Sequence, residues 1–61
     1  MKDLGKTIAK YRKEHKLNQS QLAKELENYD IYVKQNSISA WELGTATPNA
    51  RQFLALCEIL E

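Results

Sequence analysis

Two neighbouring amide side chains, Gln35 and Asn36, have the types and spacing that favour a specific chemistry. They stand at the expected start of a helix, and each carboxamide presents a hydrogen-bond donor beside an acceptor. That pair of groups matches the acceptor and donor that adenine offers in the major groove of B-form DNA, into which an α-helix fits. Polar residues at a helix start are more often simply solvated, so these two residues alone favour an ordinary surface.

The same helix carries smaller side chains that would share the groove-facing side. Ser39 and Ala40 lie one turn further on, past the apolar Ile38. A serine hydroxyl can bond to base edges, and the alanine methyl can touch the methyl group of thymine. Lys34 directly precedes the amides and would reach a phosphate or a base. The pattern is therefore that of a helix with one polar reading side.

Catalytic and metal-binding functions find little support in the composition. The 61 residues include one Cys and one His, so a disulfide scaffold, a paired-cysteine zinc site and clustered imidazoles are all excluded. No nucleophile and base can be named together, so we expect no enzyme, cofactor, metal or small-molecule ligand. No apolar run approaches the roughly 20 residues of a membrane span, and no signal-peptide core follows Met1. We expect a cytoplasmic protein without a membrane partner.

The charges are unevenly distributed along the chain, although the net charge is only +1. Residues 1–24 carry seven basic and two acidic side chains, whereas residues 25–61 carry two basic and six acidic ones. A basic first segment is most often a solvated helix face. It is also what a phosphate-facing surface requires.

Helical periodicity predicts helices over residues 3–16, 19–29, 35–43 and 50–60. In the first, Leu4, Ile8, Tyr11 and His15 form one stripe after a capping Asp3. In the third, Ile38 and Trp41 face the core and Gly44 provides the left-handed stop.

Two of these helices begin with the spacing of a capping box, in Asn18 with Gln21 and in Asn49 with Gln52. The last helix is apolar over a wide face, which predicts that it is the most buried and that Cys57 is a small core residue. Residues 28–33 lack helical period, and we interpret them as a loop or as a prolonged second helix followed by a turn. The whole chain is then a single all-α domain, a compact bundle of four short helices, or five.

Three blocks in order resemble the lambda-repressor-like helix-turn-helix family, which includes phage repressors and Cro proteins (XRE type). Residues 17–23 (LNQSQLA) are similar to the opening of its second helix, and residues 37–44 (SISAWELG) to its recognition helix with the glycine stop. Residues 47–49 (TPN) and 53–57 (FLALC) resemble its loop and fourth helix. The resemblance extends from Leu4 to Leu60 and implies a helix-turn-helix domain.

The resemblance also implies roles for single residues. Base-reading positions are matched by Gln35, Asn36, Ser39 and Ala40. Contacts to the DNA backbone are implied for Gln19, Lys34, Ser37, Thr45, Thr47, Asn49, Arg51 and Arg12. Gln19 matches a position that often also supports the first residue of the recognition helix. Trp41 and Ile38 have a structural role by their core spacing, and the resemblance implies one for Arg12 with Glu42, which match an ion pair found in some members.

The chain departs from the family pattern in three ways. Residues 27–32 form an insertion within the motif, which we interpret as a longer second helix and turn. No Ser or Thr caps the recognition helix, since Val33 and Lys34 stand there. A fifth helix is missing, so we expect either a piece of a longer repressor or a natural truncation.

The implied function is sequence-specific binding of double-stranded DNA, as a transcriptional repressor or regulator at a palindromic operator. A homodimer on DNA is expected, because one such module buries little surface. The alternative is a helical protein-interaction or antitoxin-type module that does not read DNA, which the near-zero net charge favours. RNA binding through the basic first helix is a further alternative, against which the lack of a stacking array of aromatic residues counts.

Overall fold

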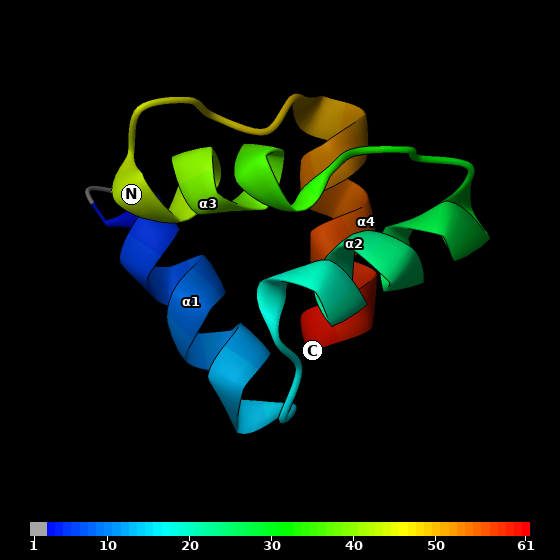
Figure 1. The fold of residues 1–61 in the computed structure, drawn as a ribbon, viewed down its shortest axis with the longest axis horizontal. Coiled ribbons are helices and arrows are strands. Elements are labelled where there is room, and N and C mark those ends of the chain that lie inside the picture. The colour runs from blue at the N-terminus through cyan, green and yellow to red at the C-terminus, as the bar shows by residue number, and fades with distance from the viewer. Residues whose placement is uncertain (1–2) are drawn as a thin grey trace.

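The computed structural model describes residues 3–61, and within them the chain is all-helical without a strand. The elements are α1 (Leu4–Glu14), α2 (Gln19–Leu26), the short 3-10 helix η1 (Glu27–Tyr29), α3 (Gln35–Leu43) and α4 (Ala50–Leu60). Figure 1 shows the amino end of α1 beside the carboxyl end of α3, with α4 running behind α2. The predicted all-α architecture of four short helices is confirmed. Lys2, counted above in the basic segment, lies outside the described residues.

The inward side of α1 differs from the predicted stripe. Ile8 is buried as expected, but Tyr11 is 42% exposed and His15 is exposed as well. The buried polar residue is instead Arg12, one turn after Ile8. The helix also ends at Glu14, two residues earlier than predicted, because Lys16 adopts a left-handed backbone with φ 58°. Asp3 occupies the cap position, but its side chain makes no capping hydrogen bond.

The segment after α2 is a prolonged end of this helix followed by a turn, which was the second of the two interpretations of the sequence. The Asn18–Gln21 capping box starts α2, and η1 prolongs its carboxyl end by one tight turn. Asp30 then reverses the chain in a left-handed conformation, with φ 60°. The backbone N–H of Ile31 donates to Leu26 O at 3.1 Å, and the Ile31 side chain is buried. The inserted residues therefore supply a core anchor that periodicity does not predict.

The predicted boundaries of α3 and the predicted start of α4 are confirmed. Gly44 ends α3 with φ 83°, a conformation that costs a residue with a side chain about 1–2 kcal/mol. The capping box of Asn49 and Gln52 starts α4. Pro48 is buried in the connecting loop.

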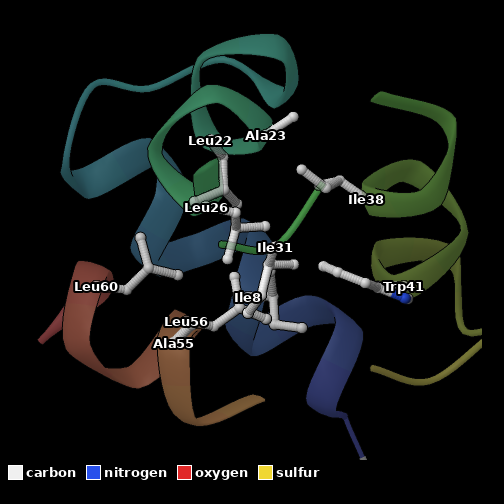
Figure 2. Packing of buried hydrophobic residues seen from close by; sticks show 10 residues of the cluster. All are labelled: Ile8, Leu22, Ala23, Leu26, Ile31, Ile38, Trp41, Ala55, Leu56 and Leu60. Carbon is white, nitrogen blue, oxygen red and sulfur yellow. The ribbon is translucent and has the colours of Figure 1, made fainter. Parts of the chain in front are cut away.

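Every α-helix contributes to one apolar core, together with Ile31 from the linking segment (Figure 2). Its members are Ile8, Leu22, Ala23, Leu26, Ile31, Ile38, Trp41, Ala55, Leu56 and Leu60. The prediction that Cys57 is buried is wrong, since Cys57 is exposed and Leu54 is 65% exposed. The buried stripe of α4 contains fewer residues than the apolar residues of this helix predict. Within residues 3–61 no further element covers its outer side.

Candidate nucleic-acid interface

The first residues of α2 and α3 meet at one surface, where their side chains are hydrogen-bonded to each other. Gln35 Nε2 donates to Gln19 Oε1 at 3.2 Å, and Ser20 Oγ donates to Gln35 Oε1 at 3.3 Å. Gln35 and Asn36 are both exposed. The candidate reading residue is therefore presented outward while its amide is held in place from α2.

The carboxylate of Glu42 determines which atom donates and which accepts in the hydrogen bonds between these amides. Gln19 Nε2 donates to Glu42 Oε1 at 3.0 Å, and an ionised carboxylate can only accept. The side-chain oxygen of Gln19 is then oriented toward Gln35 and accepts a hydrogen bond from its amide nitrogen. The side-chain oxygen of Gln35 accepts from the hydroxyl of Ser20. Each end of the Gln35 amide still keeps one unused hydrogen-bonding position. The side chain can therefore offer a donor and an acceptor without breaking either contact.

Glu42 is fixed by a buried arginine from α1. Arg12 Nε donates to Glu42 Oε2 at 2.6 Å, and Arg12 Nη2 donates to Glu42 Oε1 at 3.1 Å. A third bond runs from Arg12 Nη1 to Leu17 O at 2.9 Å. Such a bidentate contact is stabilising and also constrains the relative orientation of the two side chains. Here it connects α1 to α3. The ion pair implied by the family resemblance is present.

The pair shifts the acidity of both groups. Burial alone would raise the pKa of the Glu42 carboxyl, but hydrogen bonds from Arg12 and Gln19 and the charges of Arg12 and Lys13 outweigh it. The net result is a pKa below the ordinary value of 4.5. The hydrogen bond to Glu42 raises the pKa of Arg12 further, against the effect of its burial. Both groups are therefore charged at neutral pH.

The close approach of α1 to α3 depends on Gly5. A Cβ atom at this position would lie 2.5 Å from the backbone oxygens of both Trp41 and Glu42. No real side chain tolerates that distance to backbone atoms, so α1 can seat Arg12 against Glu42 only with glycine here. Gly5, Ile8 and Arg12 form the inward stripe of α1, at positions i, i+3 and i+7.

The remaining predicted residues fall into three groups by exposure. On α3, Ser37, Ser39 and Ala40 are half-buried, and Ser39 and Ala40 share a side with Gln35 and Asn36 by helical period. Exposed positions are held by Lys34, Thr45, Thr47, Asn49 and Arg51. Arg12 is 9% exposed, with its guanidinium committed to Glu42 and Leu17, so it is poorly placed to reach a phosphate.

Several of the exposed residues already have structural partners. Thr45 Oγ1 donates to Ala40 O at 3.3 Å, and Asn49 Oδ1 accepts from the backbone of Gln52. Arg51 lies on α4, where it lines a hollow with Tyr29 and Glu58, and not on α2 or α3, which carry the amide cluster. Lys34 precedes α3 without capping it, so the first backbone N–H groups of α3 have no side-chain cap. An uncapped helix start next to a lysine suits an anion such as a phosphate group.

Sequence reasoning missed Ser20, which fixes the acceptor end of Gln35. A serine in the first turn of a helix is usually a surface residue, and only its position next to Gln19 hinted at a role.

Among residues 3–61 no group of three or more His, Cys, Asp and Glu could hold a metal ion. No helix in this part of the chain is long and apolar enough to span a bilayer.

Comparison with known families identifies the class to which this arrangement belongs. The model of a family described as a helix-turn-helix domain matches residues 5–61. The chain therefore belongs to the helix-turn-helix domain family, in agreement with its lambda-repressor-like resemblance. Members of this class are typically non-enzymatic modules that bind DNA and regulate its use. Searches of curated proteins and of solved structures gave no match to the chain.

Proposed function

We propose that this protein binds double-stranded DNA sequence-specifically, with the amino end of α3 in the major groove, and acts as a transcriptional repressor or regulator. The observation that carries the proposal is the outward-facing amide of Gln35, held from α2 by Gln19 and Ser20. A preoriented donor–acceptor pair at the leading end of a groove-sized helix is what adenine recognition requires. Cytoplasmic location belongs to the same proposal.

Base reading is assigned to the side of α3 opposite its core residues. Gln35 and Asn36 would bond to adenine edges, and Ser39 and Ala40 would lie over the next base pairs. Ile38 and Trp41 are buried and hold this side outward. The four proposed reading residues are separated by one and four positions, which places them on one helical face.

Contacts to the DNA backbone are assigned to the residues around this face. Gln19, Lys34 and Ser37 surround the starts of α2 and α3, and Thr45, Thr47 and Asn49 follow the carboxyl end of α3. Phosphate contacts fix register without reading sequence, and lysine adds a salt-dependent attraction. Arg12 is left out of this set because its buried ion pair occupies it, and Arg51 because it lies on α4 and on neither of the two helices that carry the amide cluster.

The working unit is proposed to be a homodimer on a palindromic operator. One module of this size buries too little DNA surface for tight and selective binding, and two copies on a two-fold symmetric site double it. Half-sites would then be separated by about one helical turn, 10–10.5 base pairs.

Selection of binding sites from a pool of random duplexes tests the proposal directly. We expect an enriched motif with two inverted half-sites, and binding that weakens steeply as salt is raised. Enrichment of a single half-site would refute the palindromic operator while keeping sequence-specific binding. Absence of binding to any duplex at low salt would refute DNA recognition, and would favour the protein-interaction module.

A further inference from the structure

The outward face of α4 is not used by the fold or by the proposed DNA contacts, since Arg51, which the family resemblance related to the DNA backbone, is not among the proposed contacts. Its exposed residues are Ala50, Arg51, Leu54, Cys57, Glu58 and Glu61. Leu54 stands in the middle of this face and is 65% exposed, one of the large apolar side chains that the described residues leave open to solvent. The face therefore consists of an apolar centre with charged residues beside it.

The charged residues on this face interact unfavourably with the dipole of α4. Arg51 stands in the first turn and Glu58 and Glu61 at the last, whereas the helix dipole favours acidic residues at the amino end and basic ones at the carboxyl end. No residue at the i±3 or i±4 positions of Arg51 or Glu58 carries an opposite charge. Within residues 3–61 the ion pair of Arg12 with Glu42 is the only one formed. Nothing inside the described chain therefore compensates these charges.

We propose that a second copy of this chain packs on this face, with the two α4 helices antiparallel about a two-fold axis near Leu54. Antiparallel pairing sets the positively charged amino end of each helix beside the negatively charged carboxyl end of the other. In this register Leu54 lies against Cys57 of the second copy, and Arg51 faces Glu58 of the second copy. The contact is self-complementary, as a two-fold interface must be.

The heptad positions support this register. When Leu54 and Cys57 are taken as the a and d positions of a short seam, Arg51 and Glu58 both fall at e. In an antiparallel pair the e positions of the two helices face each other, so the two residues meet as opposite charges at both ends of the seam. A parallel pair would set e against g, and the g positions are Phe53 and Leu60, which are partly or fully buried in the parent chain. The charges therefore favour the antiparallel arrangement.

The shape of the molecule leaves room beside the seam. A hollow of about 210 Å³ lies along the charged flank of α4, lined by Tyr29, Ile31, Arg51, Leu54, Ala55 and Glu58. Tyr29 is 38% exposed at its rim, so an aromatic side chain would border the partner helix.

The contact should be weak and concentration-dependent. A helix of 11 residues is about 16 Å long, and a pair of them buries less than the roughly 1,600 Å² of a stable complex. This pairing does not require DNA, so it can be tested on the free protein.

A charge exchange measured by sedimentation equilibrium tests the proposal. R51E and E58R should each weaken self-association about tenfold, because each places like charges at both ends of the seam. The double variant R51E/E58R should restore wild-type association. Both single variants follow the preference of the helix dipole, so their thermal stability at low protein concentration should equal or exceed that of the wild type. This readout separates a lost contact from a lost fold.

Two outcomes would overturn the proposal. One is a wild-type protein that stays monomeric at the highest attainable concentration. The other is a double variant that associates no better than the single ones. L54D provides a further check, since it should abolish association while its affinity for a duplex with one half-site stays unchanged. Failure of the wild type to bind any duplex would refute the proposed function alone, because the association is measured without DNA.

Discussion

The side-chain amide of Gln19 donates to the carboxylate of Glu42 across 3.0 Å, which connects a buried ion pair to the proposed reading surface. Glu42 is held by Arg12 from α1, and Gln19 in turn accepts from Gln35. One carboxylate therefore fixes both the contact of α1 with α3 and the orientation of the amide that faces solvent. We therefore expect substitution of Glu42 to affect both the stability of the fold and the proposed recognition of DNA.

Replacing Glu42 with glutamine should destabilise the fold at neutral pH by about 1–3 kcal/mol, because Arg12 stays buried without its counter-charge. The pKa of Glu42 lies below its ordinary value in the folded protein, so its contribution is present above about pH 4.5 and is lost as the pH falls through the folded-state pKa. The difference between wild type and E42Q should therefore shrink in acid. Urea unfolding followed by circular dichroism at several pH values measures it.

The exposed Glu25 on α2 offers a matched control, since E25Q removes the same charge from a solvated position. Its stability should stay within about 0.5 kcal/mol of the wild type. A stability difference for E42Q that stays constant into acid would contradict the role of the charged carboxylate.

Replacing Gly5 with alanine should destabilise the protein by about 2 kcal/mol, because the added Cβ would collide with the backbone of α3. The backbone cannot rotate aside as a side chain can, so α1 must shift away and the Arg12–Glu42 pair must loosen. Thermal and urea unfolding measure the loss. The neighbouring exposed Lys6 provides the control, as K6A should change stability little. A G5A protein as stable as K6A would show that α1 and α3 are not packed this closely.

Sequence reasoning predicted those parts of the fold that depend on local signals. The capping boxes at Asn18 and Asn49 and the left-handed Gly44 are each encoded within a few residues, and they appear as expected. The stripe of α1 was predicted wrongly in its second half, because an arginine and a glycine do not look like inward-facing residues. Arg12 and Gly5 face inward only because α3 supplies a carboxylate to one and backbone oxygens to the other.

The candidate site was predictable only as a set of residues. Gln35 was indicated by its amide chemistry at an expected helix start and by family resemblance, and Gln19 and Glu42 by the resemblance alone. The direction of the hydrogen bonds between them depends on distances that no sequence pattern contains. Ser20 was missed for the same reason, since its partner lies 15 residues further along the chain. The exposed Cys57 was missed because composition shows that a helix is apolar but not how much of it is covered.

Removing the hydroxyl of Ser20 should relax base preference at the position read by Gln35. Q35A should cost about 1–3 kcal/mol on the preferred site, and S20A about 0.5–1.5 kcal/mol, because the acceptor end of the amide is then free to turn. In the Q35A background S20A should have no further effect, which a double-mutant cycle on the preferred and a substituted duplex would show. Additive losses from the two changes would mean that Ser20 acts on DNA independently of Gln35.

Removing the charge of Lys34 should weaken binding to every duplex and leave base preference unchanged. Lys34 is exposed and directly precedes the uncapped start of α3, so we expect its ammonium group and the helix N–H groups to attract the same phosphate. Loss of one phosphate contact lowers the slope of log affinity against log salt by about 1, which titrations at several salt concentrations measure. K10A is the matched control, because Lys10 lies over the ring of Tyr11 on α1, 5.6 Å from its centroid. Its slope should equal that of the wild type. If K34A instead changed preference among bases with an unaltered slope, Lys34 would be a reading residue and not a phosphate contact.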